Sequence, residues 1–338
     1  MASKTLLFRA DGNNQIGMGH YIRSLALAQM LKNHFNCAFA IQNPIPAQKK
    51  NIETACERII ELKTSNKDEF LNFVSSQDIV VIDNYCFSTE YQRAIKSKGC
   101  KLVYIDDLND KHYVADLIIS NTIGSGVQYS KENYTKLLLG YQYALLRQPF
   151  LLAAQYIKQQ KVHQQSKGRA LITMGGSDPH VVIRELANQC LSHPNVSELH
   201  IISSIPPTCL QPTTKRVYSY GQQTAEQMAN LMRQVDFGLL PASSLAMEAT
   251  ACRLPFICGW FVANQKHHYQ TITQNKIAIG IGELTNLNEE LVASAISAIT
   301  ETDTARKLRE QQQLQLDGKS QERLVQAFLN LTQNGIKI

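Results

Sequence analysis

The sequence predicts an α/β protein made of two doubly wound, Rossmann-like domains that face a shared cleft. Its 338 residues suffice for about two domains, each with its own core. Short apolar runs alternate with helical stretches, and the alternation starts again after a polar segment rich in Gln and Lys. We therefore expect an N-terminal α/β domain over 1–150, a linker over about 151–167 and a C-terminal α/β domain over 168–338.

The first domain is predicted from apolar runs that end at acidic residues. The run at 79–82 is Ile-Val-Val-Ile and ends at Asp83, which is typical of a parallel strand covered on both faces. The run at 102–105 ends at Asp106 and Asp107. The predicted elements are strands over 4–10, 79–82, 102–105 and 115–120, and a helix over 19–33.

The second domain repeats this alternation and then turns helical. We expect strands over 170–174, 199–203, 216–218, 236–240 and 255–258, and helices over 181–191, 224–233 and 243–252. Three further helices are predicted between 288 and 330, which either dock on the first domain or mediate self-association. Ligands of such sheets bind at the carboxyl ends of the strands, so the loops there are the candidate sites.

Composition excludes several classes of protein. Hydrophobic residues make up 44% of the chain and charged residues 18%, which is not the composition of a disordered protein. The net charge of +6 has no concentrated basic run, so we expect no nucleic-acid partner. No segment approaches the roughly 18 apolar residues of a membrane span, and the first residues lack a signal peptide. With eight dispersed cysteines, expected to be reduced thiols, this predicts a cytoplasmic protein.

The most informative loop runs from Arg9 to Arg23 between a predicted strand and a helix. Gly17 and Gly19 allow a ligand to approach the main chain, and the following helix directs free N–H groups at an anion. His20 lies in the first helical turn beside that anion, and Arg23 shares its face. The alternative interpretation is a tight turn with a surface histidine.

A second loop, over 240–249, again places small residues between a strand and a helix. Ser243 and Ser244 cap that helix and turn hydroxyls and amides toward a phosphate. Glu248 follows Ser244 by four residues, so its carboxylate can accept hydrogen bonds from a ribose diol. The alternative is a glutamate on the helix surface. Together the two loops favour a nucleotide ligand.

Eight short motifs, taken in order, resemble the PseG family, the nucleotide-sugar hydrolases of pseudaminic acid biosynthesis. They lie at 9–11, 15–23, 83–85, 106–108, 143–147, 174–178, 242–249 and 264–265. The resemblance implies the two-domain GT-B fold shared with the lipid II synthase MurG. It also implies release of UDP from UDP-2,4-diacetamido-2,4,6-trideoxy-β-L-altropyranose. The chain departs from the family at Asn84, where a histidine is common, and in its three final helices.

The resemblance assigns roles to residues that match its motifs. His20 is the general base on water, at the mouth of an interdomain gap, and the anomeric centre is inverted. Tyr85 lines the sugar pocket, whereas Asn264 and Gln265 lie beside the phosphates and sugar. The remaining predicted substrate-binding residues are Arg9, Asp11, Gly17, Gly19, Arg23, Gly176, Ser177, Ser243, Ser244, Leu245 and Glu248. We expect no cofactor, no metal, no membrane and no nucleic acid, and a UDP-sugar as the partner.

Several residues keep two interpretations. Asp11 either orients His20 or Arg23, or caps its loop. The loop at 175–178 either meets the nucleotide or forms a turn and an N-cap. Asp106 and Asp107 are expected to form a turn at a strand end rather than a metal site, and His267 and His268 to lie on the surface.

Two other functions use the same residues. A GT-B glycosyltransferase would pass the sugar to an acceptor hydroxyl, and a non-catalytic subunit would only bind the nucleotide sugar. Hydrolysis needs a stabilised diphosphate and a positioned water, which helix N-termini and an imidazole can supply. A transferase with a lipid acceptor would expose an apolar or basic patch on the first domain, whereas the segment over 44–67 is polar and mixed in charge. The resemblance therefore implies a hydrolase.

Overall fold

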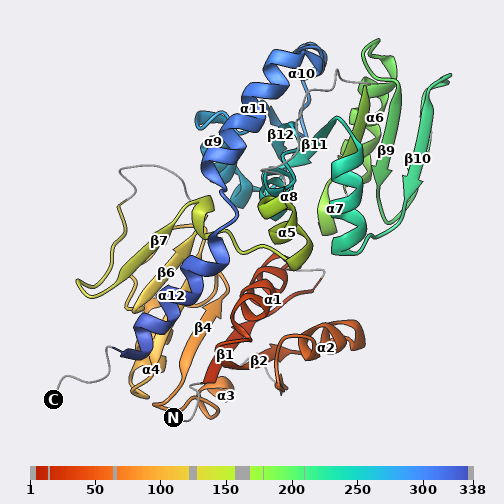
Figure 1. The fold of residues 1–338 in the computed structure, drawn as a ribbon. Helices are drawn as coiled ribbons and strands as arrows, with labels where there is room; N and C mark the ends of the chain where they lie inside the picture. Colours follow the sequence, from red (N-terminus) through yellow and green to blue (C-terminus); the bar gives the residue numbers. More distant parts are fainter. Residues whose placement is uncertain are drawn as a thin grey trace. The chain divides into compact units, whose positions relative to one another are not determined.

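The computed structural model describes residues 5–13, 16–63, 67–121, 128–156, 168–177, 179–208 and 210–333 (Figure 1). The chain divides into two compact units. The first comprises Met1–Gln148 and Lys319–Ile338, and the second comprises Pro149–Gly318. Each unit holds one sheet whose strands all pair in parallel. The predicted pair of doubly wound α/β units is confirmed.

The sheet of the first unit has seven strands in the order β3-β2-β1-β4-β5-β6-β7. Their bounds are β1 Thr5–Ala10, β2 Asn36–Gln42, β3 Arg58–Leu62, β4 Ile79–Asp83, β5 Lys101–Asp106, β6 Leu117–Ser120 and β7 Lys136–Leu139. Every residue of β4 is buried, as its continuous apolar sequence predicts. The sequence analysis missed β2, β3 and β7, of which β3 and β7 are the sheet edges.

Helices cover this sheet on both faces. They are α1 Gly19–Leu31, α2 Pro46–Glu53, α3 Lys67–Leu71, α4 Thr89–Lys96, the 3-10 turn η1 Tyr141–Tyr143 and α12 Ser320–Gln333. Helix α1 buries most of its length, including the polar residues His20, Arg23 and Ser24. Buried polar groups need partners, so this helix is where a site is to be sought.

The second unit has a six-stranded sheet in the order β10-β9-β8-β11-β12-β13. The strands are β8 Arg169–Thr173, β9 Glu198–Ile202, β10 Arg216–Tyr220, β11 Phe237–Pro241, β12 Phe256–Trp260 and β13 Ile279–Glu283. The helices are α5 Gln148–Tyr156, α6 His180–Ser192, α7 Ala225–Gln234, α8 Ser244–Ala251, α9 Lys266–Gln274, α10 Glu289–Thr300 and α11 Thr302–Gln315, with 3-10 turns η3 Gly175–Ser177 and η4 Ala263–Gln265. An apolar core built on β8, β9, β11 and α6 holds the unit together.

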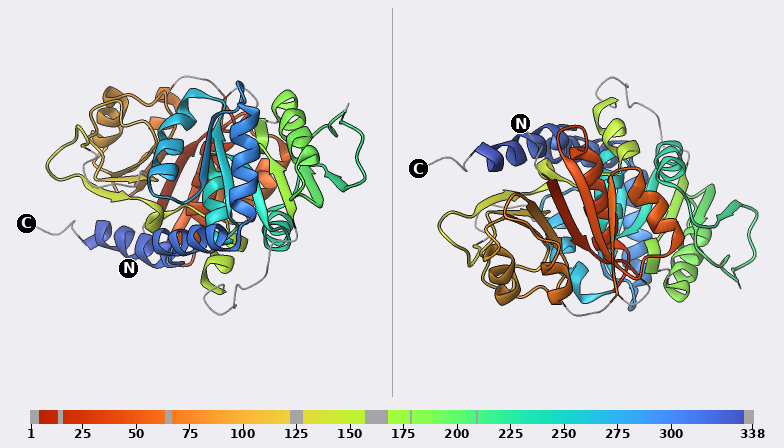
Figure 2. Two further views of the ribbon diagram at one scale, coloured as in Figure 1. Left: turned by 90° about the horizontal axis from the view of Figure 1, so that it is seen from above. Right: turned by 90° about the horizontal axis from the view of Figure 1, so that it is seen from below.

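The last helix, α12, belongs to the first unit, which differs from the predicted domain of 168–338. It runs beside α1 (Figures 1 and 2). The Phe328 ring meets the Phe35 ring edge-on at 6.3 Å, and Gln321 Nε2 donates to the Met30 carbonyl at 3.0 Å. The final helices were expected either to dock on the first domain or to mediate self-association. Helix α12 docks on the first unit, because its apolar face packs against α1.

The predicted linker over 151–167 begins inside a helix. Helix α5 extends to Tyr156, and residues 157–167 lie outside the described part of the chain. Gln155 Nε2 donates to the carbonyl of Gly318, where the chain returns to the first unit. A Cβ on Gly318 would lie 3.0 Å from the Ala154 carbonyl oxygen, and its φ of +82° already favours glycine.

Seven cysteines are free thiols, and all of these except Cys86 are buried; Cys209 lies outside the described residues. Burial raises the pKa of Cys37 to about 12, which keeps that thiol protonated. In the ranges described, no helix has both the length and the apolar character that crossing a bilayer requires.

Candidate functional site

In both sheets the order in which successive strands are added reverses next to the first strand of the unit. In the first unit β1 lies between β2 and β4, and in the second unit β8 lies between β9 and β11. The carboxyl ends of the two strands at such a switch point form the usual ligand site of an open α/β sheet. The predicted site residues His20 and Tyr85 follow β1 and β4, whereas Gly176 and Ser243 follow β8 and β11. Each unit thus brings its predicted residues to one edge of its sheet.

The loop after β1 keeps open space before helix α1. Gly17 has a φ of +81° and forms an isolated bridge with Asn13, whose Oδ1 accepts from the Ile16 amide at 2.9 Å. Gly19 opens the helix, and a Cβ there would meet no described heavy atom within 4 Å. Among the described residues, the side chain of the N-cap residue Met18 accepts no hydrogen bond from the first-turn amides of the helix. The first-turn amides of α1 are therefore suited to an anion.

His20 is held by a carboxylate from the neighbouring strand. Its Nδ1 lies 2.6 Å from Oδ1 of Asp83, the last residue of β4, and the strand register pairs Ala10 with Asp83. With the carboxylate ionised, Nδ1 carries the proton, so the ring presents Nε2 as an acceptor. Nε2 has no hydrogen-bond partner among the described residues.

His20 is only 5% exposed, which differs from the exposed position expected at the mouth of a gap. The Tyr85 ring meets it edge-on at 4.4 Å and is itself 36% exposed. The more exposed Tyr85 ring therefore packs against the buried imidazole.

Arg23 was predicted to bind an anionic ligand, but its guanidinium is engaged by two carboxylates of the protein. Nε and Nη2 each donate to one oxygen of Asp83 at 2.6 Å, and Nη1 donates to Oδ2 of Asp107. Ser24 Oγ adds a hydrogen bond of 3.1 Å to Asp83. Arg23 therefore positions carboxylates, because each of its three guanidinium nitrogens donates to a carboxylate of the protein.

The balance of charge keeps Asp83 ionised. Burial by itself would raise the pKa of this carboxyl, but Arg23 and His20 outweigh burial and lower it to about 2. Burial would likewise lower the pKa of Arg23, whereas Asp107 and Asp83 raise it well above its ordinary value. The bidentate pair is thus a buried, fully charged support under the imidazole.

The two acids after β5 have different surroundings. Asp106 is buried and accepts from the hydroxyls of Tyr113 at 2.6 Å and Tyr129 at 2.9 Å, and from the Asn109 amide at 3.0 Å. These contacts make it the anchor of a strand-end turn, as predicted. Asp107 points back to the site and accepts from Arg23 and, at 3.2 Å, from the Tyr85 hydroxyl. Among the described residues, no cluster of three metal-ligating side chains occurs.

Arg9 and Asp11 pair with each other. Arg9 Nη1 lies 2.5 Å from Asp11 Oδ1, which also accepts from the Gln42 amide at 2.8 Å, and the Arg9 guanidinium stands over the Phe87 ring. Asp11 therefore caps its loop by accepting the amide of Gln42 at the end of β2. Asp83, and not Asp11, orients His20 and Arg23. A contact of Arg9 or Asp11 with a ligand stays a prediction.

In the second unit, the loop after β11 forms the start of α8. Ser243 is the N-cap, and its Oγ accepts from the Leu245 amide at 3.3 Å, as the sequence predicts. Ser244 is half-buried in the first turn. Glu248, one turn later, is only 4% exposed and so is not a surface glutamate. A buried carboxylate at this place has a structural or binding purpose.

The loop after β8 lies against the same helix end. Gly175 has a φ of +71°, and a Cβ there would stand 3.3 Å from Leu245 Cδ1. Gly175 and Gly176 are exposed within η3. The side chain of Ser177 and all of Asp178 lie outside the described part of the chain. The structure thus brings Gly176 to the N-terminus of α8, which both interpretations of this loop allow.

The predicted pair Asn264 and Gln265 stands at the start of α9. Asn264 is exposed in η4, and Gln265 Oε1 accepts from the Phe261 amide at 3.1 Å. His267 is exposed, as expected. His268 is half-buried instead, with Nδ1 3.3 Å from the Ala242 carbonyl oxygen. This contact ties the start of α9 to the loop before α8.

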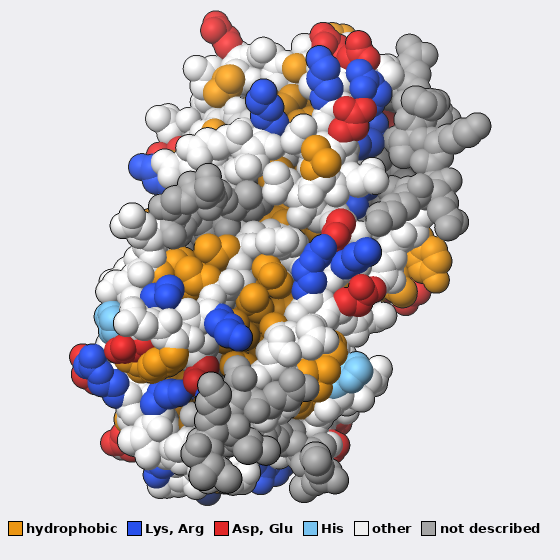
Figure 3. Space-filling view, turned by 60° about the vertical axis from the view of Figure 1, so that its left-hand side comes forward, with side chains coloured by type: hydrophobic (Ala, Val, Ile, Leu, Met, Phe, Trp, Pro, Cys, Tyr) orange, Lys and Arg blue, Asp and Glu red, His pale blue; other side chains and the backbone are white. Residues whose placement is uncertain are grey.

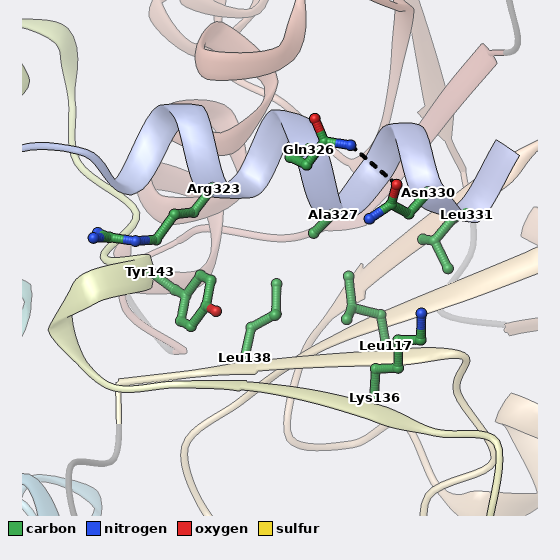
Figure 4. Close-up of a pocket in the computed structure, with 9 residues that line it drawn as sticks. All are labelled: Leu117, Lys136, Leu138, Tyr143, Arg323, Gln326, Ala327, Asn330 and Leu331. Atoms are coloured by element: carbon green, nitrogen blue, oxygen red, sulfur yellow. Dashed lines mark hydrogen bonds between the residues drawn. The ribbon is translucent and has the colours of Figure 1, made fainter. Parts of the chain in front are cut away.

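A separate cavity of about 320 Å³ lies between α12 and strands β6 and β7 of the first unit (Figure 4). Apolar side chains form its floor, and Lys136 and Arg323 stand at its rim. Figure 3 shows one face of the molecule on which apolar side chains are exposed among lysine and arginine side chains. The cavity is lined by Leu117, Lys136, Leu138, Tyr143, Arg323, Gln326, Ala327, Asn330 and Leu331, none of them a predicted site residue.

Sequence comparison finds relatives at low identity. No protein-family model matches the chain. It is 27% identical over 274 residues to the UDP-2,4-diacetamido-2,4,6-trideoxy-β-L-altropyranose hydrolase of Campylobacter jejuni, covering 77% of this chain and 93% of that protein. It is 23% identical over 291 residues to the spore coat polysaccharide biosynthesis protein SpsG of Bacillus subtilis, covering 81% of this chain and 83% of that protein.

Solved structures match nearly the whole chain. MurG of Acinetobacter baumannii superposes with a TM-score of 0.67 at 10% identity, covering 96% of this chain and 99% of MurG. A calicheamicin glycosyltransferase, CalG4, superposes with a TM-score of 0.67 at 11% identity, covering all of both chains. The chain has the GT-B fold. At this identity the likeness concerns architecture alone.

Within this GT-B chain, the sequence analysis missed two site residues, Asp83 and Asp107. Both were visible as acids that end apolar runs, and the analysis used them to mark strand ends. Acidic residues at the carboxyl ends of neighbouring parallel strands meet at one sheet edge, which is also where the β1 loop ends. That signal could have assigned them to His20 and Arg23.

Proposed function

We propose that this protein hydrolyses UDP-2,4-diacetamido-2,4,6-trideoxy-β-L-altropyranose to UDP and the free 2,4-diacetamido sugar, a precursor of pseudaminic acid. The observation that carries the proposal is the hydrogen bond between His20 and Asp83, which fixes an imidazole with Nε2 as acceptor. The similarity to the Campylobacter jejuni hydrolase supports the choice of substrate.

In the proposed reaction His20 acts as the general base. Nε2 takes a proton from a water molecule while the water oxygen attacks the anomeric carbon and the bond from that carbon to the diphosphate oxygen breaks. The electron pair of the broken bond leaves with UDP, and the anomeric centre is inverted by this single displacement. Asp83 holds the Nδ1 proton and stabilises the imidazolium that forms, without taking that proton itself.

The second unit is proposed to bind UDP. The N-terminus of α8 presents the Ser243 and Ser244 hydroxyls to the diphosphate, with Leu245 beside them. Two further segments are proposed to contact UDP. Gly176 and Ser177 do so from the loop before α6, and Asn264 and Gln265 from the start of α9. The Glu248 carboxylate accepts hydrogen bonds from the two ribose hydroxyls. UDP is a weakly basic leaving group, so stabilising its charge suffices and no general acid is required.

The reaction is tested by incubating the purified protein with the UDP-sugar in the absence of any acceptor. We expect UDP to accumulate, and in water enriched in oxygen-18 the label to enter the sugar and not UDP, since the anomeric carbon is attacked. The sugar released first should have the opposite anomeric configuration in proton NMR. UDP that appears only after an acceptor is added would instead favour a glycosyltransferase.

The role of His20 is tested with His20→Ala. This variant should bind the UDP-sugar with little change in Kd and lose about 10²–10⁴-fold in kcat. His34→Ala, which removes an exposed histidine just beyond α1, is the matched control and should keep full activity. Full turnover by His20→Ala contradicts the assigned base, and binding without turnover by the wild type would favour a binding subunit.

A further inference from the structure

Asp107 is the exposed end of the charged network beneath His20. Its side chain is 23% exposed, compared with 1% for Asp83, and only its Oδ2 is used, by Arg23 Nη1 and the Tyr85 hydroxyl. Oδ1 has no hydrogen-bond partner among the described residues. The network therefore fixes a carboxylate at the site with one acceptor oxygen left for a ligand.

The turn that carries Asp107 is rigidly anchored. Asp106 is buried against the hydroxyls of Tyr113 and Tyr129, which fixes the end of β5. The next residue, Leu108, is 36% exposed, as is Tyr85, although both are large and apolar. Asp107 thus lies next to apolar surface from Leu108, its neighbour in the chain, and from Tyr85, its hydrogen-bond partner. An acceptor oxygen beside apolar surface matches a group with an N–H donor and a methyl.

We infer that Asp107 is a specificity-determining residue that accepts a hydrogen bond from the N–H of an acetamido group of the sugar. This inference rests on the proposed function, whose substrate carries two such groups near the anomeric carbon that His20 serves. Leu108 and Tyr85 take the acetyl methyl. A sugar with a hydroxyl in that place offers the donor but leaves the apolar contact unfilled, so the site selects acetamido sugars.

The test uses Asp107→Asn with three substrates, the diacetamido UDP-sugar and two analogues in which one or the other acetamido group is replaced by acetoxy. Each analogue keeps the carbonyl and methyl but lacks one N–H. Because Arg23 and Tyr85 both donate, the asparagine turns its oxygen to them and its NH2 to the ligand. The acceptor thereby becomes a donor.

We expect the wild type to lose about 10–100-fold in kcat/KM when the N–H at one position is removed. Asp107→Asn should lose as much on the diacetamido substrate and discriminate less than about threefold between that substrate and the analogue that the wild type disfavours. Asp110→Asn, which changes an exposed acid paired with Lys111 in the same turn, is the matched control and should discriminate like the wild type. Circular dichroism and Tm verify that each variant is folded.

The two proposals fail differently. Wild-type turnover with unchanged discrimination by Asp107→Asn would overturn the role of Asp107 and leave the hydrolase in place. Absence of turnover by the wild type would overturn the hydrolase. Calorimetric binding of the diacetamido UDP-sugar and the two analogues then decides the role of Asp107 by itself, since equal affinity of the wild type for all three would refute the hydrogen bond.

Discussion

The imidazole of His20 and the carboxylate of Asp83 lie 63 positions apart in the chain and 2.6 Å apart in the structure. The contact depends on two adjacent parallel strands, since Asp83 ends β4 and His20 follows β1 by one loop. Asp83 also accepts from Arg23 and Ser24, so it is the centre of the first unit's polar network. Its substitution is therefore the most direct test of that network.

Replacing Asp83 by Asn should lower kcat by about 10²–10⁴-fold and change KM little. An amide is neutral and cannot stabilise the imidazolium, and it lets the His20 ring adopt the other tautomer. Steady-state kinetics over a range of pH measure this loss. Ser24→Ala, which removes only a neutral donor at 3.1 Å, is the control and should cost less than about tenfold. A folded Asp83→Asn with near wild-type kcat would remove Asp83 from the mechanism.

The lowered pKa of Asp83 also predicts a pH dependence of stability. The folded value is about 2 and the ordinary value is 3.8, so the unfolded chain binds more protons in this interval. The contribution of Asp83 is complete above pH 4 and is lost as the pH falls toward 2. It amounts to roughly 2 kcal/mol, because one pKa unit corresponds to about 1.4 kcal/mol.

This dependence is measured as the difference in unfolding free energy between wild type and Asp83→Asn, from hydrogen exchange of the β1 and β4 amides. The difference should shrink by roughly 2 kcal/mol between pH 5 and pH 2. Asp110→Asn, which changes an exposed acid of the same unit, is the matched control and should leave the exchange of the β1 and β4 amides at pH 5 as in the wild type. A difference that grows toward low pH would reverse the sign and contradict the ionised, paired state of Asp83.

The sequence predicted most of this architecture because its signals were local. Continuous apolar runs such as Ile79 to Ile82 became buried parallel strands, and Ser243 became the cap of α8. Strand β2 was missed although its centre is Cys-Ala-Phe-Ala-Ile, and the edge strands β3 and β7 have charged and half-buried residues. Edge strands need less apolar sequence, since only part of their surface is covered.

The site was predicted less completely, because its contacts are set by strand order. The loop pattern identified His20 and Arg23, but their partners Asp83 and Asp107 arrive from two other strands. Arg23 also shows how a local rule fails. A cation on the first turns of a helix was expected to face an anionic ligand, and two carboxylates of the protein occupy that position instead. Only the tertiary structure decides between ligand and protein as the anion.

Glu248 should determine preference for ribose over deoxyribose. A buried carboxylate in the second turn of α8 can accept from both hydroxyls of a ribose, so we expect the wild type to bind UDP about 10–100-fold more tightly than 2′-deoxy-UDP. Glu248→Gln should bind the two nucleotides with similar affinity. Calorimetry measures both constants, and Glu185→Gln, at an exposed position of α6, should keep the preference. An unchanged preference in Glu248→Gln would assign Glu248 a purely structural role.

Helix α12 should stabilise the first unit selectively. Phe328 is fully buried and packs against Phe35 of the segment after α1, so Phe328→Ala should cost that unit about 3–5 kcal/mol. The single tryptophan, Trp260, ends β12 in the second unit, and its fluorescence therefore reports on that unit, whereas hydrogen exchange of β1 and β4 reports on the first.

In Phe328→Ala the exchange of the β1 and β4 amides should accelerate while the fluorescence transition of Trp260 in denaturant stays where it is. Leu314→Ala, at a position of α11 that is 73% exposed, should change neither signal, because it removes no buried contact. A shift of the Trp260 transition as large as the change in exchange would mean that α12 supports both units, and the assignment of this helix to the first unit alone would then be wrong.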